Sequence, residues 1–260
     1  MHKSMMDMYD LTGKTAIVTG GSQGLGESFA RGLAKAGCNL VLTARTFSKL
    51  EKAAEEMTRY GVKALPMQMD VNKREDIEAM VKETVDKFGK IDILVNNAGI
   101  SAVNEAENMT DSEWESVIRT NVGGLFRCSQ AVGREMLKQG FGKIINIASM
   151  YSFVGASYVP QVSYTSSKAA VLGLTREMAV EWAPKGVQVV ALAPGFFRSA
   201  QTIWAFEENK ELGEKLLARI PMGRMGKLEE LEGTIVYLAS EACGYMAGQT
   251  LTLDGGFLSW

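Results

Sequence analysis

Histidine is almost absent from this chain of 260 residues, which contains a single one, His2, near its start. A Ser-His-Asp hydrolase needs an imidazole as its general base, and catalytic zinc is held largely by histidine. The sequence therefore argues against both classes, and we expect no metal site. Any acid-base chemistry has to come from Tyr, Lys, Asp, Glu or Cys.

Cysteine is also scarce, with three widely separated residues, Cys38, Cys128 and Cys243, and no CxxC pair. This pattern favours buried thiols in a reduced compartment over a disulfide framework. No apolar run approaches the ~18 residues that a membrane span needs, and the polar start does not resemble a signal peptide. We therefore expect a cytoplasmic protein that does not associate with membranes.

Neither sign of charge dominates, since 28 Lys and Arg face 30 Asp and Glu, which gives a formal net charge of −2. Nucleic-acid affinity rests largely on clustered basic residues that face phosphates, and no such run is present. The composition therefore argues against a nucleic-acid partner. A chain of this length buries enough apolar surface to fold without disulfide or metal support.

Short apolar runs alternate with longer amphipathic segments along the whole chain. Nearly continuous apolar strands are typical of a parallel sheet that is covered on both faces, and strand-helix alternation requires right-handed crossovers. The sequence predicts one α/β domain over residues 1–260, a Rossmann-type doubly wound parallel sheet of about seven strands with helices on both faces. We expect strands at 15–19, 39–43, 63–69, 91–95, 143–148, 187–193 and 250–253, and helices at 24–36, 48–60, 73–88 and 163–183.

Two stretches, 101–111 and 196–226, do not fit this alternation. Long insertions at the carboxyl ends of strands are common places for segments that cover a substrate. The second stretch is therefore the predicted substrate lid.

The first predicted strand leads into a glycine-rich turn, Thr19-Gly-Gly-Ser-Gln-Gly-Leu-Gly26, and then a helix. Such a turn lets the backbone approach a pyrophosphate, and the following helix offers free N–H groups. The glycines at 20, 24 and 26 give GxxxGxG, which departs from the GxGxxG spacing. The turn alone would also suit an ordinary tight turn, and its position between the first strand and helix favours a dinucleotide site.

The end of the second strand indicates which cofactor binds. NAD-binding proteins place Asp or Glu there to hold the ribose 2′-hydroxyl, whereas this chain has Ala44 and Arg45. A guanidinium binds a 2′-phosphate well, so the sequence favours NADP(H) over NAD(H). The alternatives are that Arg45 only caps a solvated loop and that Lys49, a possible second contact, lies on a solvated helix face.

Further polar residues follow the third and fourth strands, at the edge where a dinucleotide would lie. Asp70 precedes Val71, and Asn96-Asn97-Ala98-Gly99 ends the fourth strand. Asp70 suits the adenine amino group as an acceptor, or the next helix as a cap, and both roles are compatible.

Tyr164 and Lys168 are spaced i,i+4 in a helical segment and so share one face. A free phenol has a pKa of ~10, and a nearby ammonium favours the phenolate. We therefore expect Lys168 to lower the pKa of Tyr164 towards working pH, which suits Tyr164 to general acid-base catalysis.

Together these motifs resemble the short-chain dehydrogenase/reductase family, over essentially the whole chain. The set comprises the glycine turn, Asn96 to Gly99, Asn121, Ser149, Tyr164-x-x-x-Lys168 and Pro194-Gly195. The resemblance implies that Tyr164 protonates a carbonyl oxygen, that Ser149 hydrogen-bonds the same oxygen, and that Lys168 holds the nicotinamide ribose. It also implies that Asn121 positions a water beside Lys168. The interval from Ser149 to Tyr164 is longer than is common in the family, and Ser152 is a weaker candidate for the Ser149 role.

The residues expected to contact the cofactor, some from the motifs and some from the resemblance, gather at strand ends and in the glycine turn. They are Gly20, Ser22, Gln23, Gly24, Leu25, Gly26, Arg45, Asp70, Val71, Asn97, Ala98, Gly99, Tyr164, Lys168, Pro194, Gly195, Phe197 and Ser199.

Substrate signals are weaker. Phe196, Phe197, Trp204 and Phe206 suit an apolar lid, Arg198 and Gln201 suit hydroxyls or a carboxylate, and ordinary packing and solvation explain each as well. Segments such as 219–224 and 254–256 resemble gluconate 5-dehydrogenase-like reductases and also 3-oxoacyl-carrier-protein reductases. The resemblance favours a sugar acid or polyol as substrate, with a 3-oxoacyl-carrier-protein or another ketone as the alternative. It also implies a homotetramer, or a homodimer, that buries helices in 104–140 and 163–183.

Two hypotheses that assign the chain a different class of function stay open. An NADP(H)-binding sensor or scaffold would keep the fold without turnover, although such proteins would be expected to lose Tyr164 or Lys168. A methyltransferase also has a glycine-rich turn after its first strand, but gives no reason for that pair.

Overall fold

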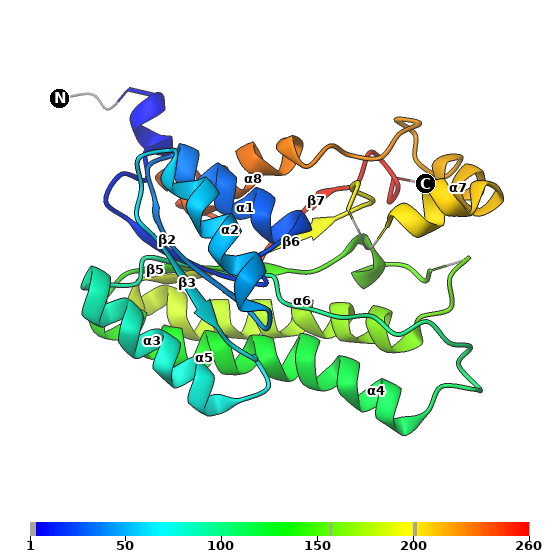
Figure 1. Ribbon diagram of the computed structural model, residues 1–260, viewed down its shortest axis with the longest axis horizontal. Helices are drawn as coiled ribbons and strands as arrows, with labels where there is room; N and C mark the ends of the chain where they lie inside the picture. Colours follow the sequence, from blue (N-terminus) through cyan, green and yellow to red (C-terminus); the bar gives the residue numbers. More distant parts are fainter. Residues whose placement is uncertain (1–3, 157, 200–201, 260) are drawn as a thin grey trace.

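The structure, a computed structural model, describes residues 4–156, 158–199 and 202–259. Its strands form one parallel sheet in the order β3-β2-β1-β4-β5-β6-β7 (Figure 1). The strands are β1 (Thr15–Thr19), β2 (Asn39–Ala44), β3 (Ala64–Gln68), β4 (Ile93–Asn96), β5 (Gly142–Ile147), β6 (Val187–Pro194) and β7 (Thr250–Leu253). The predicted fold class is confirmed, and the predicted strands deviate by at most two residues at either end.

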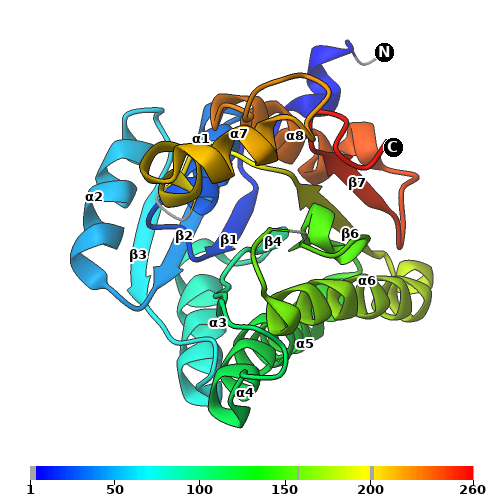
Figure 2. The same cartoon turned by 90° about the vertical axis from the view of Figure 1, so that its right-hand side faces the viewer.

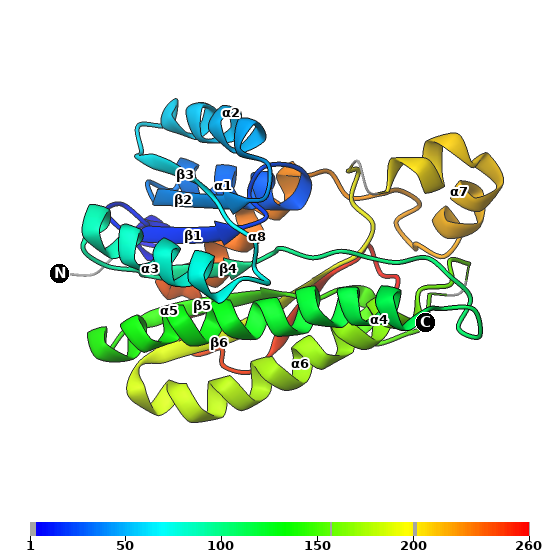
Figure 3. The same ribbon diagram turned by 60° about the horizontal axis from the view of Figure 1, so that its bottom comes forward.

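Helices cover both faces of this sheet (Figure 3). They are α1 (Gly24–Lys35), α2 (Phe47–Thr58), α3 (Arg74–Phe88), α4 (Asp111–Ile118), α5 (Leu125–Gln139), α6 (Val162–Trp182), α7 (Lys210–Leu217) and α8 (Glu229–Ala239). A π-helical turn, η2 (Arg119–Gly124), joins α4 to α5, and η5 (Trp204–Glu208) precedes α7.

Each face of the sheet has its own hydrophobic core, as the continuous apolar strands predicted. Phe29, Leu33 and Leu50 from α1 and α2 pack with α8 on one face. Met80, Val132 and Val171 from α3, α5 and α6 pack on the other. Alternate residues of one strand serve opposite faces, as Val18 and Ile17 do. The three cysteines are free and buried, as expected.

The strand order reverses between β1 and β4, so the chain leaves these two neighbours towards opposite faces. In open α/β sheets this reversal opens a crevice at the carboxyl ends of the strands, where ligands bind. Figure 1 shows α7 beyond this edge of the sheet, and Figure 2 views the molecule from the same end. The reversal therefore places the glycine turn and the segment 196–226 around one opening.

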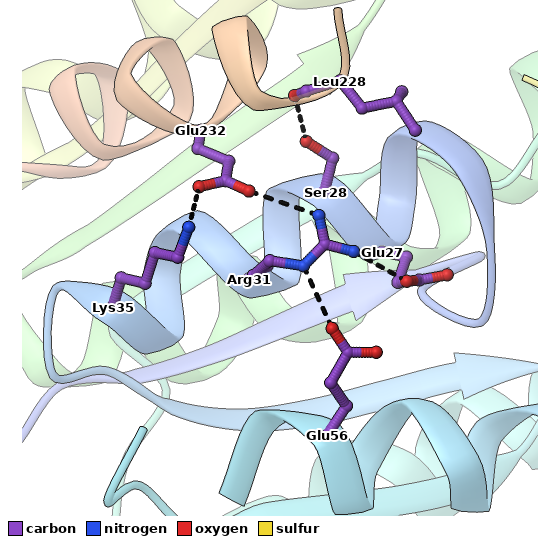
Figure 4. Close-up of polar contacts among 7 residues, drawn as sticks. All are labelled: Glu27, Ser28, Arg31, Lys35, Glu56, Leu228 and Glu232. Carbon is purple, nitrogen blue, oxygen red and sulfur yellow. Dashed lines mark hydrogen bonds and ion pairs between the residues drawn. The ribbon is translucent and has the colours of Figure 1, made fainter. Parts of the chain in front are cut away.

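Ionic contacts fix α1 against α8 and α2 (Figure 4). The largely buried Glu232 carboxylate forms salt bridges with Arg31 at 3.3 Å and with Lys35 at 2.6 Å. The Arg31 guanidinium also reaches Glu56 at 3.2 Å and Glu27 at 2.8 Å. Because α1 begins at the glycine turn, this network holds the helix whose first turn borders the cleft.

Among the helices of the described ranges, none is long and apolar enough to cross a membrane. No group of three or more His, Cys, Asp or Glu among the same residues is arranged to hold a metal ion.

Candidate active site

A cavity of about 470 Å³ opens at the carboxyl ends of the strands. Every predicted cofactor-contact residue borders it, from Gly20 in the turn after β1 to Ser199 after β6. Ser149, Tyr164 and Lys168 border it as well. Asn121 does not, because it is buried behind Gly99. The structure thus brings all but one of the predicted site residues to a single cavity.

The glycine turn is fastened to the end of β4 by the Thr19 and Asn97 side chains. The Thr19 hydroxyl accepts from the backbone N–H groups of Asn97 and Ala98, each at 3.0 Å. In return the Asn97 amide donates to the carbonyls of Thr19 and Gly20 at 3.0 and 3.1 Å. Gly20 has a φ of 67°, and a Cβ on Gly26 would lie 2.2 Å from the Gly20 carbonyl oxygen. Both positions therefore require glycine for the turn to approach a ligand so closely.

The end of β2 presents two basic side chains to the cavity. Arg45 is exposed there, and its carbonyl accepts from the Gln68 side chain at 2.9 Å. Lys49 donates to the Gln23 side chain at 2.9 Å and also borders the cavity. The solvated-face alternative for Lys49 is therefore incomplete, because its ammonium is tied to the glycine turn.

Asp70 is not the cap of the next helix. Its carboxylate accepts the backbone N–H of Asn72 at 2.9 Å in a turn, and α3 begins only at Arg74, after Lys73. This leaves the adenine-contact prediction as the remaining one for Asp70.

Two buried oxygen atoms in this part of the wall have no protein partner. They are the Thr43 hydroxyl oxygen and the Asn72 amide oxygen, and both residues border the cavity. Buried polar atoms are normally hydrogen-bonded, so each is available to a polar ligand. Together with the glycine turn and Arg45, they fit a phosphorylated dinucleotide.

The Ser149 and Tyr164 side chains interact, and the interaction lowers the pKa of Tyr164. Ser152 is turned away, because its hydroxyl donates to the carbonyl of Lys168 at 2.8 Å and accepts the Ser149 N–H at 3.2 Å. Between the two candidate serines, the geometry therefore puts Ser149 beside the phenol. Ser152 instead holds the turn that presents Ser149.

Lys168 is almost fully buried, and its ammonium donates to the carbonyl of Ile147 at 2.6 Å. Its Nζ lies 5.7 Å from the centroid of the Tyr164 ring. Burial lowers the pKa of Lys168 to about 8. Burial also raises the pKa of Tyr164, which the interaction with Ser149 only partly offsets. The predicted lowering of the Tyr164 pKa by Lys168 is therefore wrong for the protein alone, since the loss of hydration outweighs an ammonium at this distance.

Asn121 lies in the π-helical turn η2, where the helix made of α4 and α5 is interrupted. Its amide donates to the Ile100 carbonyl at 2.8 Å and to the Ser167 hydroxyl at 2.9 Å. Its side-chain oxygen accepts the Ile100 N–H at 2.8 Å. Asn121 therefore clamps the segment after β4 against α6, a role that the sequence did not indicate. Its water-positioning role stays a prediction.

The opposite wall is apolar and largely aromatic. Phe196 packs edge-on against Phe206 at 5.0 Å and against Tyr151 at 6.0 Å between ring centroids. Phe197 is buried, whereas Trp204 is partly exposed and borders the cavity. Arg198, predicted to meet hydroxyls or a carboxylate, is exposed and does not border the cavity. Gln201 and His2 lie outside the described residues.

Several wall residues were missed by sequence reasoning. Tyr151 and Met150 follow Ser149 in a short helical turn, and Val159 and Gln161 precede Tyr164. The stretch between the two catalytic candidates is thus part of the wall. Its unusual length was the available signal. The Asn104 N–H, in the other irregular stretch, bonds the Pro160 carbonyl at 3.0 Å, which pins the two loops together.

The comparisons with known proteins agree with this site. The chain belongs to the short chain dehydrogenase family, which it matches over residues 14–210. It is similar to 2-dehydro-3-deoxy-D-gluconate 5-dehydrogenase of Bacillus subtilis (strain 168), with 43% identity over 97% of this chain and 98% of the relative. It is 40% identical to 3-oxoacyl-[acyl-carrier-protein] reductase FabG of Staphylococcus aureus (strain Mu50 / ATCC 700699), over 94% of this chain and 97% of the relative.

A solved structure with a similar fold is the gluconate 5-dehydrogenase from Burkholderia cenocepacia J2315 in complex with NADP and tartrate. Its TM-score is 0.93 at 36% identity, and the match covers 99% of this chain and 100% of that one. The predicted family resemblance is thereby confirmed.

Proposed function

We propose that this protein interconverts a ketone and a secondary alcohol with NADP(H) as the hydride carrier. The observation that supports the proposal is that Ser149 and Tyr164 lie together on the wall of the cavity that Gly20 and Arg45 also border. The pair supplies a proton and a hydrogen bond at one place, and the glycine turn supplies a phosphate site close by.

The residues that would hold the dinucleotide fall into three groups. The glycine turn and the start of α1 would hold the pyrophosphate, Arg45 and Lys49 a 2′-phosphate, and Asp70 with Val71 the adenine; all of these residues border the cavity. The Thr43 hydroxyl, buried and without a protein partner, suits the adenosine end. The bound cofactor supplies or accepts the hydride at the carbonyl carbon.

The protein's own groups manage the oxygen of the substrate. During reduction Tyr164 donates its phenolic proton to the carbonyl oxygen as the new C–H bond forms, and takes the proton back in the reverse direction. Ser149 hydrogen-bonds the same oxygen and stabilises the charge that develops on it. Lys168 would hold the ribose hydroxyls beside the nicotinamide.

The preference for NADP(H) rests on Arg45. A guanidinium at the end of β2 attracts a 2′-phosphate, where a carboxylate would repel it. The related gluconate 5-dehydrogenase of known structure was solved with NADP.

For the substrate, two classes come from the relatives. A sugar acid or polyol is favoured by the 2-dehydro-3-deoxy-D-gluconate 5-dehydrogenase, and a 3-oxoacyl thioester by the FabG reductase. We further propose a single catalytic domain with residues 196–226 as its lid, in a cytoplasmic homotetramer or homodimer that buries α4, α5 and α6. Exposed Trp114, Phe126 and Val180 on these helices support such an interface.

The test is the loss of nicotinamide absorbance when NADPH meets a panel of keto-sugar acids, sugars, β-keto esters and simple ketones. Turnover of any member that Tyr164→Phe abolishes, with NADPH binding retained, supports the proposal. NADPH binding without turnover of any ketone would favour a sensor or scaffold. Tight S-adenosylmethionine binding without NADPH binding would favour a methyltransferase.

A further inference from the structure

The charged side chains on the cavity wall are unevenly distributed. Among the described residues that border the cavity, Arg45, Lys49, Asp70 and Lys168 are charged. The first three follow β2 and β3, at the end assigned above to the adenosine. Lys168 is buried beneath Tyr164 and bonded to the Ile147 carbonyl.

The part of the wall around Ser149 and Tyr164 is neutral. We call it the substrate end, and it consists of the residues within 101–103, 150–161 and 196–216 that border the cavity. Its apolar members are Val103, Met150, Tyr151, Val159, Phe196, Phe197, Trp204, Ala205, Phe206 and Leu216. Its described polar members, Ser101, Gln161, Ser199 and Thr202, carry no charge.

Some polar groups of the substrate end already form hydrogen bonds within the protein. The Thr202 hydroxyl donates to the Phe197 carbonyl at 2.6 Å and accepts the Ser199 N–H at 3.0 Å. Neither Arg198 nor Arg219 borders the cavity. The Arg219 guanidinium lies 4.6 Å from the centroid of the Phe257 ring.

A linked set of aromatic rings shapes this end. Phe196 contacts both Phe206 and Tyr151 edge-on, and it lies 6.1 Å from Phe257 between ring centroids. Tyr164 packs against the same group. Burial raises the pKa of Tyr151 to about 12 and also raises that of Tyr164, so these surroundings disfavour an anion.

We infer that the substrate of this chain is an uncharged ketone with an apolar, aromatic or branched, substituent, and that Phe196, Trp204 and Phe206 select it. A carboxylate at this end would lose its hydration without meeting a cation, which is strongly unfavourable. An aryl group would instead meet ring edges in the arrangement that aromatic pairs prefer. This inference rests on the proposed function for its chemistry. It separates this chain from relatives that are named for sugar acids.

Binding and turnover are measured separately on wild-type protein loaded with NADP(H). Calorimetry with NADP⁺ present, and NADPH oxidation, are run with acetophenone and with two isosteric ketones, 4-acetylbenzamide and 4-acetylbenzoate, which differ in charge. A keto-sugar acid is the fourth ligand. We expect kcat/KM and affinity to be at least about tenfold higher for the amide than for the anion, because the unpaired charge is rejected. The kcat/KM and the affinity should also be higher for acetophenone than for the keto-sugar acid.

Two variants of the wall complete the test. Trp204→Arg, at a partly exposed position that accommodates a long side chain, should raise the benzoate-to-benzamide ratio at least tenfold, by about the cost of one unpaired charge. Phe206→Ala should raise KM for acetophenone about tenfold or more through lost ring contact. Tyr245→Ala, on a fully exposed residue outside the cavity, is the matched control and should change neither.

The outcomes separate the two proposals. Preference for the anion or the keto-sugar acid over the neutral ketones, in binding or in turnover, overturns the inference. Equal treatment of the amide and the anion overturns it as well. Preferred binding of the neutral ketones without any turnover upholds the substrate class and refutes the proposed function instead.

Discussion

The Ser149 and Tyr164 side chains interact on the wall of the cavity, and the interaction lowers the pKa of Tyr164. This contact joins the segment that follows β5 to the first turn of α6. In the proposed function, the proton donor and a second hydrogen-bond donor would thereby be directed at the same point before a substrate arrives. Such preorganisation is the feature that an enzyme needs to stabilise charge on a carbonyl oxygen.

Ser149→Ala should lower kcat by about 100-fold or more, because one donor to the developing oxyanion is lost. Ser152→Ala is the matched control, since its hydroxyl bonds the Lys168 carbonyl and the Ser149 N–H and faces no substrate. It should keep kcat within a few-fold and lower the free energy of unfolding by about 1 kcal/mol. Steady-state kinetics and urea unfolding of both variants check this. A larger kcat loss in Ser152→Ala would reverse the assignment of the two serines.

Lys168 should make a contribution to stability that rises with pH between about 8 and 10. Its pKa is lowered by burial to about 8 from an ordinary 10.5, so in this window the unfolded chain binds more protons than the folded one. The contribution of this group to the free energy of unfolding therefore increases with pH, by at most about 1.4 kcal/mol per unit. The raised pKa values of the buried thiols of Cys38, Cys128 and Cys243 act in the opposite direction from about pH 9, and those of Tyr151 and Tyr164 from about pH 10. The contribution of Lys168 is therefore measured as a difference between two proteins that share all of these groups.

Urea unfolding of the protein alone at several pH values from 7.5 to 9.5, compared with Lys168→Met, measures this slope. The variant should lose it. Lys143, whose pKa is also lowered by burial, is present in both proteins and cancels in the comparison. Parallel curves for the two proteins would contradict the lowered pKa of Lys168.

The sequence predicted the sheet well because its strands are local patterns. Runs such as 15–19 and 187–193 are rich in apolar residues and bounded by turn residues, so their positions need no knowledge of the rest of the chain. The cofactor candidates also gathered correctly, because the carboxyl ends of parallel strands meet at one edge.

Features that depend on distant partners were not predictable. The clamp of Asn121 on Ile100 depends on a π-helical turn, and the Tyr164 pKa depends on how deeply the fold buries the ring. The contact between Arg31 and Glu232 joins residues 201 positions apart. The spacing of residues in the sequence does not predict such contacts, because they depend on how α1 and α8 pack.

Glu232→Gln should destabilise the protein by about 1–3 kcal/mol, because Arg31 and Lys35 then face each other without the buried carboxylate. Glu211→Gln, which breaks an exposed pair with Lys215, should leave the free energy of unfolding unchanged within error. Urea unfolding of the two variants makes the comparison. Equal effects would mean that the α1–α8 network adds no more than a surface pair does.

Arg45→Asp should invert the cofactor preference. Arg45 is exposed at the end of β2 and borders the cavity, where a guanidinium attracts a 2′-phosphate and a carboxylate repels it while accepting from a 2′-hydroxyl. We expect the ratio of kcat/KM for NADPH over NADH to fall by about 100-fold, as a close attraction becomes a repulsion. Lys49→Ala is the control for a second, weaker contact. Because the Lys49 ammonium is already bonded to Gln23, the NADPH-to-NADH ratio should fall only a few-fold.

Because the Arg45 charge is exposed, rising salt should weaken NADPH binding to wild type more than to Arg45→Asp. An unchanged ratio in Arg45→Asp would mean that the 2′-phosphate contact lies elsewhere on the wall.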